Sequence, residues 1–313
     1  MNVTVTLNPM LDKTVAVSGI AIGRITRAER VTMIVGGKGV NVSRQLFHLG
    51  KGSLATGFLG GEIGGLLERL LTEEGLTHRF VRVGGMTREG VTYRHTDGTM
   101  TSVFEPPHRV TSAEADALVA FCAQSIHRGD RVICCGSSPC PEADTVYAEI
   151  FRNSRKAGAQ TLLDSYGRVF QEALATVPDF IKLNRDECEQ AHGVRLRAEA
   201  DVVGALDRFL AAGVGCAVIT DGARAVYAAT TQKRWRINPP VVPAVNPTGS
   251  GDSMLAALVY GMEAGWPMER NLRFGVAAGS ANAARWELAC ASQQEIEVLV
   301  PHVHLEEISR DHS

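Results

Sequence analysis

Short runs of apolar and β-branched residues alternate along the chain with longer segments of helical period. The strand-like runs are residues 2–7, 54–58, 131–135, 160–164, 180–183 and 217–220. Helical periods follow two of them, at 65–74 and 143–157, and an apolar stripe with steps of three or four residues runs from Ala115 to Ile126. Because strands and helices alternate, we expect an α/β fold with a central, mostly parallel sheet flanked by helices.

Two regions interrupt this alternation. Residues 13–35 and 77–104 are rich in Thr, Val and Arg, alternate with a period of two, and lack a helical period. We expect them to form a small β-sheet, a discontinuous lid on an α/β catalytic domain made of residues 1–12, 36–76 and 105–313. Active sites of open α/β sheets lie at the carboxyl edge of the strands, where a lid would exclude water.

Composition narrows the functional classes. Of the 313 residues, 45% are hydrophobic and 21% charged, which is typical of a globular protein with a substantial core. The net charge is −2, so the chain has no basic field for nucleic acid or for an anionic membrane. Seven cysteines without a Cys-x-x-Cys pair predict neither a disulfide framework nor a structural zinc site. Without a leader-like start or a bilayer-length apolar run, we expect a soluble, cytoplasmic protein.

The first candidate site is the glycine-rich segment Gly36-Gly37-Lys38-Gly39-Val40-Asn41, which opens onto a helical stretch. Backbone N–H groups at a helix start attract anions, and Lys38 adds a positive charge. The segment is not a Walker A loop, because Gly follows Lys38, and it is not a Gly-x-Gly-x-x-Gly fingerprint. A tight strand-to-helix turn without a ligand explains the same residues.

The second candidate site is Asn246-Pro247-Thr248-Gly249-Ser250-Gly251-Asp252-Ser253, followed by the helical run 254–262. The N–H groups of Gly249, Ser250 and Gly251 would neutralise a transferring phosphate. Asp252 would accept the proton of an acceptor hydroxyl. The pattern suits phosphoryl transfer, although a simple helix cap by Asp252 or Ser250 is an open alternative.

Two weaker signals concern charged ligands. Asn184 and Glu187 follow a strand-like run three residues apart, where their oxygens would organise Mg²⁺ through its waters, or would belong to a solvated helix start. Several arginines in the two lid segments would suit a second phosphate, carried by the acceptor. These arginines are Arg24, Arg27, Arg88 and Arg94.

Three segments together resemble the ribokinase-like (PfkB) carbohydrate kinases. They are Thr-Leu-Asn-Pro-Met-Leu-Asp at 6–12, Gly-Gly-Lys-Gly-Val-Asn-Val at 36–42 and Val-Asn-Pro-Thr-Gly-Ser-Gly-Asp at 245–252. More narrowly, they resemble the 1-phosphofructokinase and tagatose-6-phosphate kinase branch. The resemblance implies a ribokinase-like fold, ATP and Mg²⁺, and a homodimer joined through the lid. It also implies transfer of the γ-phosphoryl group to a hydroxyl of fructose 1-phosphate, tagatose 6-phosphate or fructose 6-phosphate.

The resemblance also assigns roles to individual residues. It makes Asp252 the catalytic base and gives the anion hole to Gly249, Ser250 and Gly251. The sugar hydroxyls would contact Asp12, Gly37 and Asn41. The acceptor's phosphate would contact Lys38 and Arg88, with Arg27 as a helper. The nucleotide would contact Asn184, Glu187, Thr220, Gly222 and Asn282, and Glu187 would hold Mg²⁺ through water.

Departures from the branch pattern keep other functions open. Residues 136–141 and 286–290 differ from the branch, beside the acceptor and the nucleotide respectively. The alternatives are a kinase for an unphosphorylated sugar or a nucleoside, and a noncatalytic sugar-phosphate sensor. The complete loop with Asp252 argues against a sensor, which has no need of a base. A nicotinamide dehydrogenase is disfavoured by the missing dinucleotide fingerprint.

Overall fold

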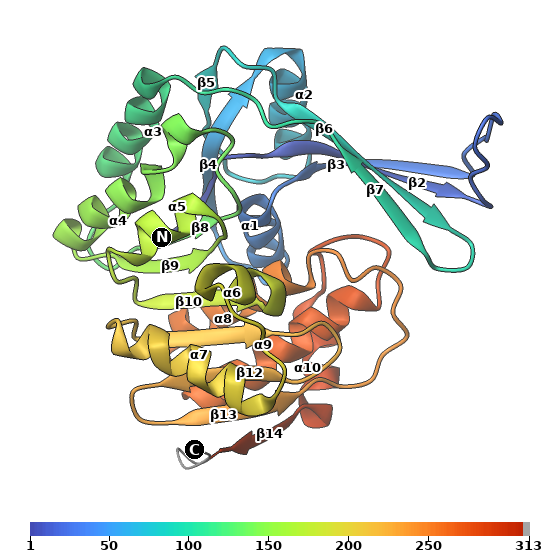
Figure 1. The fold of residues 1–313 in the computed structure, drawn as a ribbon. Coiled ribbons are helices and arrows are strands. Elements are labelled where there is room, and N and C mark those ends of the chain that lie inside the picture. Colours follow the sequence, from blue (N-terminus) through green and yellow to red (C-terminus); the bar gives the residue numbers. More distant parts are fainter. Residues whose placement is uncertain (309–313) are drawn as a thin grey trace.

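The main body of the protein is a large sheet with helices on both faces (Figure 1). The computed structural model describes residues 1–308. The strands of the large sheet are β1 (Asn2–Thr6), β4 (Ser53–Gly60), β5 (Val81–Val83), β8 (Arg131–Cys135), β9 (Gln160–Asp164), β10 (Phe180–Asn184), β11 (Cys216–Thr220), β12 (Val226–Thr230), β13 (Arg234–Asn238) and β14 (His304–Glu307). Their order is β14-β13-β12-β11-β10-β9-β8-β1-β4-β5. Neighbouring strands are parallel from β5 to β11 and antiparallel from β11 to β14.

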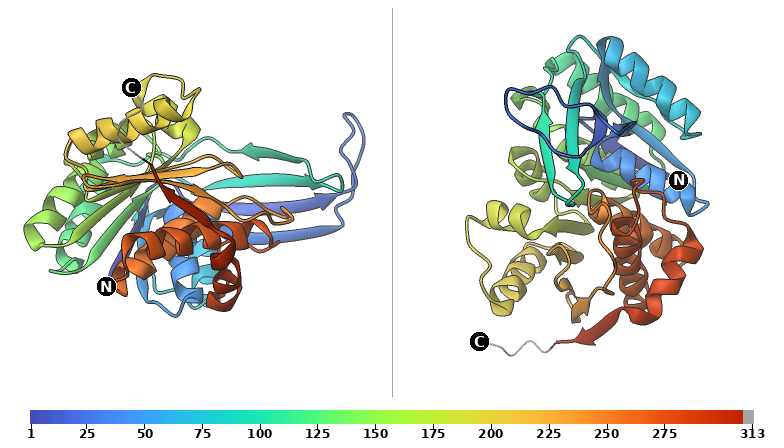
Figure 2. Two further views of the ribbon diagram at one scale, coloured as in Figure 1. Left: turned by 90° about the horizontal axis from the view of Figure 1, so that it is seen from below. Right: turned by 90° about the vertical axis from the view of Figure 1, so that its right-hand side faces the viewer.

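Helices cover the two faces of the large sheet, as the two views of Figure 2 show. On one face lie α3 (Ser112–Ser125), α4 (Val146–Ala157), α5 (Arg168–Leu174), α6 (Arg185–His192) and α7 (Glu199–Ala211). On the other lie α1 (Lys38–His48), α2 (Gly61–Glu73), α8 (Ser250–Glu263), α9 (Met268–Ala283) and α10 (Gln293–Leu299). Short 3₁₀ helices form η1 (Pro141–Ala143) and η2 (Val300–His302).

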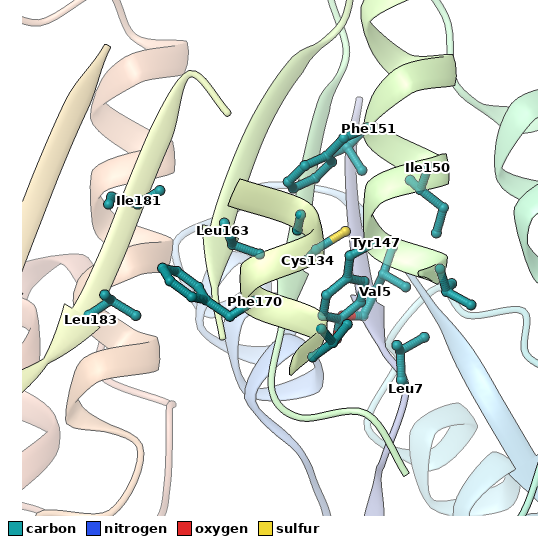
Figure 3. Packing of buried hydrophobic residues seen from close by; sticks show 14 of the residues in the cluster. Val5, Leu7, Cys134, Tyr147, Ile150, Phe151, Leu163, Phe170, Ile181 and Leu183 are labelled. Carbon is teal, nitrogen blue, oxygen red and sulfur yellow. The ribbon is translucent and has the colours of Figure 1, made fainter. Parts of the chain in front are cut away.

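Alternation along the strands decides which side chains reach the core and which reach the carboxyl edge. Leu163 of β9 and Leu183 of β10 pack with Phe170 of α5 in the core of the first face, shown in Figure 3. Successive side chains of a strand point to opposite faces. The strand neighbours Asp164 and Lys182 therefore point to the other face, where α1 and α8 begin.

A second, smaller sheet extends away from the main body (Figure 1). Its strands are β2 (Met10–Val17), β3 (Arg30–Gly36), β6 (Arg88–His95) and β7 (Met100–Phe104), in the order β3-β2-β6-β7. Residues 81–83, which we placed in this sheet, instead pair with β4 in the large sheet. The reason is burial: Phe80 and Val83 are apolar and pack into the main cores, which holds their segment on the main body.

The α/β fold with a mostly parallel sheet, flanking helices and a separate small sheet is confirmed. The division into a catalytic domain and a lid stays a prediction, and its last residues, 309–313, lie outside the described residues. The antiparallel edge formed by β12, β13 and β14 was not predicted. No helix within residues 1–308 has the length and apolar character needed to cross a bilayer.

Candidate active site

Elements far apart in the sequence bring the candidate groups together at the carboxyl edge of the large sheet. Asn41, in the first turn of α1, donates from Nδ2 to Oδ2 of Asp252, in the first turn of α8, at 2.7 Å. The two residues are 211 positions apart. Arg44, one turn further along α1, donates to Oδ1 of Asn41 at 2.9 Å and so fixes which way its amide points. The first and second candidate segments therefore form one site.

Asp252 has the environment of a general base. Its side chain is buried, with 6% of the residue exposed. Burial, and next the negative charge of Asp164, raise the pKa of Asp252 to about 6, against the opposing influence of Lys38, Lys182 and the Asn41 hydrogen bond. A carboxyl group with a pKa near the working pH is ionised at pH 7 and still basic enough to take a proton.

Two lysines and two carboxylates surround the start of α8. Nζ of Lys38 lies 2.8 Å from Asp164 Oδ1 and 2.5 Å from Glu187 Oε1. Nζ of Lys182 lies 2.5 Å from the other Asp164 oxygen. Burial by itself would raise the pKa of Asp164, but the two lysines lower it below its ordinary value. Burial opposes the charge of Lys38, yet the facing carboxylates raise its pKa well above the ordinary value. Lys38 thus stays charged beside Asp252.

The loop before α8 has the geometry of an anion site. Gly249 has φ +74°, and a side chain at this position would collide with Leu288, whose Cγ would lie 2.8 Å from the added carbon. The amides of Gly251 and Asp252 have no backbone acceptor among residues 1–308. The Ser250 amide, which we included in the anion hole, donates to the Pro247 carbonyl at 3.2 Å. The free donors therefore sit at the helix start, where the helix dipole also favours an anion.

One of the three residues expected to hold the sugar, Asp12, lines a cavity of about 480 Å³ between the small sheet and the main body, whereas Gly37 and Asn41 are not among its lining residues. Asp12, on β2, is among its walls, and Oδ1 of this residue is buried without a hydrogen-bond partner. Burial raises the pKa of Asp12, and Arg44 partly offsets this. Gly37 caps α1 with φ +130°, a conformation that leaves no room for a side chain beside Thr6. An unpartnered carboxylate oxygen in a cavity is suited to a sugar hydroxyl.

Arg88, at the start of β6, takes no part in the ion-pair network of Lys38 and Lys182. Its Nη2 donates to the Asn8 carbonyl at 3.4 Å, and its Nε is buried without a partner. No carboxylate within residues 1–308 forms an ion pair with it. Burial lowers the pKa of Arg88. Lys38 pairs with carboxylates, whereas the guanidinium of Arg88 makes one long hydrogen bond to a carbonyl. That the two residues hold one phosphate stays a prediction.

Arg27, the predicted helper, lies in the exposed connection between β2 and β3. In Figure 1 this connection is at the outer end of the small sheet, away from the carboxyl edge where α1 and α8 begin. Within this chain, Arg27 is therefore not brought to the site.

The predicted nucleotide residues have different positions. Asn184 caps α6 by accepting the Glu187 N–H at 2.8 Å, and Glu187 Oε2 accepts the Asn184 N–H at 2.9 Å. The two residues thus form the capping box of a helix start, but Glu187 is buried instead of solvated, and its Oε1 reaches Lys38. Thr220 ends β11, and Gly222 is exposed just beyond it with φ +57°. Both lie on the neighbouring strand end, beside Asn184.

The side chain of Asn282 is buried and forms hydrogen bonds within the protein. It is 1% exposed, and its Nδ2 donates to the Thr248 carbonyl at 2.8 Å and to Ser250 Oγ at 3.1 Å. Its Oδ1 accepts the N–H of Ala289 at 2.7 Å. The side chain therefore ties the loop before α8 to the segment that follows α9, and its hydrogen-bonding groups are already satisfied within the protein.

Two residues of the site were not predicted, Asp164 and Lys182. Their signals are visible in the sequence: Lys182 is the one charged residue of a buried strand, and Asp164 ends another. Only the pairing of β9 with β10 shows that they face each other.

Comparison with known proteins fits this geometry. Residues 6–290 match the pfkB family of carbohydrate kinases. A proposed phosphofructokinase from Staphylococcus aureus is 29% identical, with a TM-score of 0.82 and 99% of both chains covered. Phosphofructokinase-2 from Escherichia coli, solved with potassium, is 25% identical, with a TM-score of 0.89 over 96% of this chain and 97% of that one. A proposed 1-phosphofructokinase from Thermotoga maritima is also 25% identical, with a TM-score of 0.89 over 99% of this chain and 100% of that one.

The ribokinase-like fold that we expected is therefore confirmed. The match spans most of the chain, and it includes the turn before α1 and the loop before α8. The chain belongs to the pfkB family of carbohydrate kinases, phosphotransferases whose acceptor is a sugar hydroxyl.

Proposed function

We propose that this protein is an ATP-dependent kinase for a phosphorylated ketohexose, namely fructose 1-phosphate, tagatose 6-phosphate or fructose 6-phosphate. The acceptor oxygen attacks the γ-phosphorus, the bond from that phosphorus to the β-phosphate oxygen breaks, and ADP leaves. The hydroxyl proton passes to Asp252. Because Oδ2 of Asp252 accepts from Asn41, Oδ1 is the oxygen free to take the proton.

The groups around Asp252 suit the charge that develops in this reaction. The amides at the start of α8 and the lysines Lys38 and Lys182 surround the place where the γ-phosphoryl would lie. Fixed donors and cations of this kind supply most of the stabilisation in phosphoryl transfer. No three His, Cys, Asp or Glu side chains within residues 1–308 form a metal cage. Mg²⁺ would therefore be held mainly by the triphosphate and water, as it prefers, with Glu187 in contact through a water.

Arg88 is the observation that favours a phosphorylated acceptor. A largely buried guanidinium without a carboxylate is costly unless an anion completes it. The residue that accepts from Arg88 is Asn8, through its backbone carbonyl. The side chain of Asn8 carries a hydrogen-bond donor, Nδ2, which lies 3.4 Å from Ser137 Oγ. A free sugar or a nucleoside would leave this charge unpaired, whereas a sugar phosphate would satisfy it with bidentate hydrogen bonds.

An acceptor panel tests the proposal. ADP release from Mg²⁺-ATP is measured with fructose 1-phosphate, tagatose 6-phosphate, fructose 6-phosphate, fructose and a nucleoside. We expect turnover of a phosphorylated ketohexose, lost in Asp252→Asn. In Arg88→Ala we expect KM for that acceptor to rise by about 10- to 100-fold, because a charge-assisted hydrogen bond is lost. Arg69→Ala, in an exposed part of α2, is the matched control.

Two outcomes would contradict the proposal. Equal turnover of fructose and its phosphates would favour the kinase for an unphosphorylated sugar. Tight binding of a sugar phosphate without any ADP release would favour the noncatalytic sensor.

We further propose that the small sheet is a lid that joins two copies of the chain. One face of this sheet carries exposed apolar side chains beside the Lys13–Glu89 ion pair, with Val31 at 55% and Val103 at 62% exposure. Val15 and Val91 lie on the same face by strand register. Such a patch favours a partner. Light scattering should show a dimer that Val31→Glu dissociates, while Val298→Glu on α10 leaves it intact; a monomeric wild type would refute the pairing.

We also propose a cytoplasmic location. ATP is available there, and each of the seven cysteines, all within residues 1–308, is free of a disulfide bond. Fractionation of the source cells would test this, and recovery outside the cytoplasm would contradict it.

A further inference from the structure

The segment that departs from the family pattern, 286–290, inserts an aromatic ring between two arginines of the lid. The ring centroid of Trp286 lies 4.7 Å from Cζ of Arg30 on β3 and 4.5 Å from Cζ of Arg94 on β6. Both distances are within the range of cation–π attraction. The indole is therefore contacted by a guanidinium group from each of two lid strands.

Strand register explains why the ring fits there. Ala16 on β2 pairs with Arg30 on one side and with Arg94 on the other, so the three residues share a face of the lid. Neighbouring strands are about 4.8 Å apart, which separates β3 from β6 by roughly 10 Å. Because the residue between the two arginines carries only a methyl group, a slot remains over β2, and both guanidinium groups lie over the indole.

Polar contacts reinforce the insertion. Nε1 of Trp286 donates to Oγ1 of Thr32 at 3.4 Å, and the carboxylate of Glu287 lies 3.5 Å from Arg30. Within residues 1–308, the polar and cation–π contacts that join lid residues 13–34 and 91–104 to the main body all involve Trp286 or Glu287. The outer part of the lid is thus held to the main body by polar and cation–π contacts at one place, residues 286–287.

The segment 286–290 also contacts the loop before α8, which precedes Asp252. The carbonyl of Trp286 accepts from Asn246 Nδ2 at 3.1 Å, and Leu288 fills the space above Gly249. Ala289 has φ +56°, which is unfavourable for a residue with a side chain. Its N–H is held by Asn282, which also binds the loop. The segment is therefore fixed at both ends, by the lid and by the anion-binding loop.

We propose that Trp286 is a positioning residue that couples the lid above the acceptor to the loop beneath the transferring phosphate. This inference rests on the proposed function for its catalytic consequence, but the coupling itself is a property of the folded chain. When the ring is in its slot, the lid and the loop are held in one arrangement. When the ring is absent, the outer lid moves independently of the loop.

Hydrogen–deuterium exchange of the full-length protein tests the coupling without any substrate. We expect Trp286→Leu to speed exchange in β3 and β6 by about 5- to 30-fold, the effect of losing two cation–π contacts. Ala16→Leu fills the slot while leaving Trp286 and both arginines in the chain, and should have the same effect. Trp266→Leu is the matched control, because Trp266 stacks on Arg270 at 4.0 Å outside the lid.

Kinetics supply the second measurement. With a phosphorylated ketohexose, Trp286→Leu should lower kcat and raise ATP hydrolysis without acceptor phosphorylation, because an unfastened lid admits water. The coupling is overturned if exchange in β3 and β6 is unchanged in both Trp286→Leu and Ala16→Leu. If wild type phosphorylates no acceptor while exchange responds as expected, the proposed function fails and the coupling stands. If either Trp286→Leu or Ala16→Leu does not fold, the exchange measured in the other variant decides whether the coupling exists.

Discussion

Replacement of Asp252 by Asn should stabilise the protein while it removes the activity. Asn has nearly the shape of Asp and keeps an oxygen to accept from Asn41, whose Nδ2 lies 2.7 Å from Asp252 Oδ2. It cannot take a proton from the acceptor hydroxyl. We expect kcat to fall by about 10²- to 10⁴-fold, which is the usual contribution of a general base.

The size of the stability effect follows from the pKa of the buried carboxyl. Folding raises the pKa of Asp252 from its ordinary value of 3.8 to about 6, mainly through burial. Above pH 6 the folded protein must hold this group ionised, which costs about 3 kcal/mol relative to the unfolded chain. Below about pH 4 the group is protonated in both states and the cost is absent. Stability is therefore lost as the pH rises from 4 to 6.

Urea unfolding of wild type and Asp252→Asn at several pH values from 4 to 8 measures this difference. We expect the variant to be more stable by up to about 3 kcal/mol at pH 8, and the two proteins to converge near pH 4. Wild-type kcat/KM should fall tenfold per pH unit below about pH 6, because Asp252 becomes protonated. Asp252→Asn should not show this decrease at acidic pH. Asp116→Asn, on the exposed side of α3, is the control.

Two results would refute this reasoning. A variant no more stable than wild type at pH 8 would show that ionised Asp252 is fully compensated by Lys38 and Lys182. If Asp252→Asn kept some activity, and that activity decreased below about pH 6 as in wild type, another group would be the one that takes the proton.

Three further predictions concern the residues that support the site. Lys182→Met should destabilise the protein by about 3 kcal/mol, since it leaves buried Asp164 with one lysine instead of two; urea unfolding checks this, and an unchanged midpoint would contradict it. Gly249→Ala should lower both stability and kcat, whereas Gly265→Ala, also at positive φ but in open space, should cost only the backbone strain of about 1 kcal/mol; equal effects would show that Leu288 does not matter. Asn282→Ala should lower the free energy of unfolding by about 1–3 kcal/mol without changing the preference for ATP over GTP, and a changed preference would support its predicted contact with the nucleotide.

Much of the fold follows from local patterns in the sequence. Apolar residues that recur every two residues predict strands, and those that recur every three to four residues predict helices, because the buried positions of each element are apolar. This is why β1, β4, β8, β9, β10 and β11 were expected, and why the small sheet was expected where the helical period is lost. The two glycine-rich motifs likewise predicted the starts of α1 and α8, because a helix start depends on residues that are adjacent in the chain.

Only the tertiary structure decides which of these groups meet. Lys38 was expected to hold a phosphate with Arg88, and the structure shows it paired with Glu187, which is 149 residues away, and with Asp164 at the end of β9. The nucleotide contact of Asn282 stays a prediction, and the structure shows that its side chain ties the loop before α8. Asp164 pairs with Lys182, and Trp286 with the arginines of the lid, through strand order and register, which no local pattern encodes. Composition and period determine the elements, whereas the order in which strands pair determines which charges are buried together.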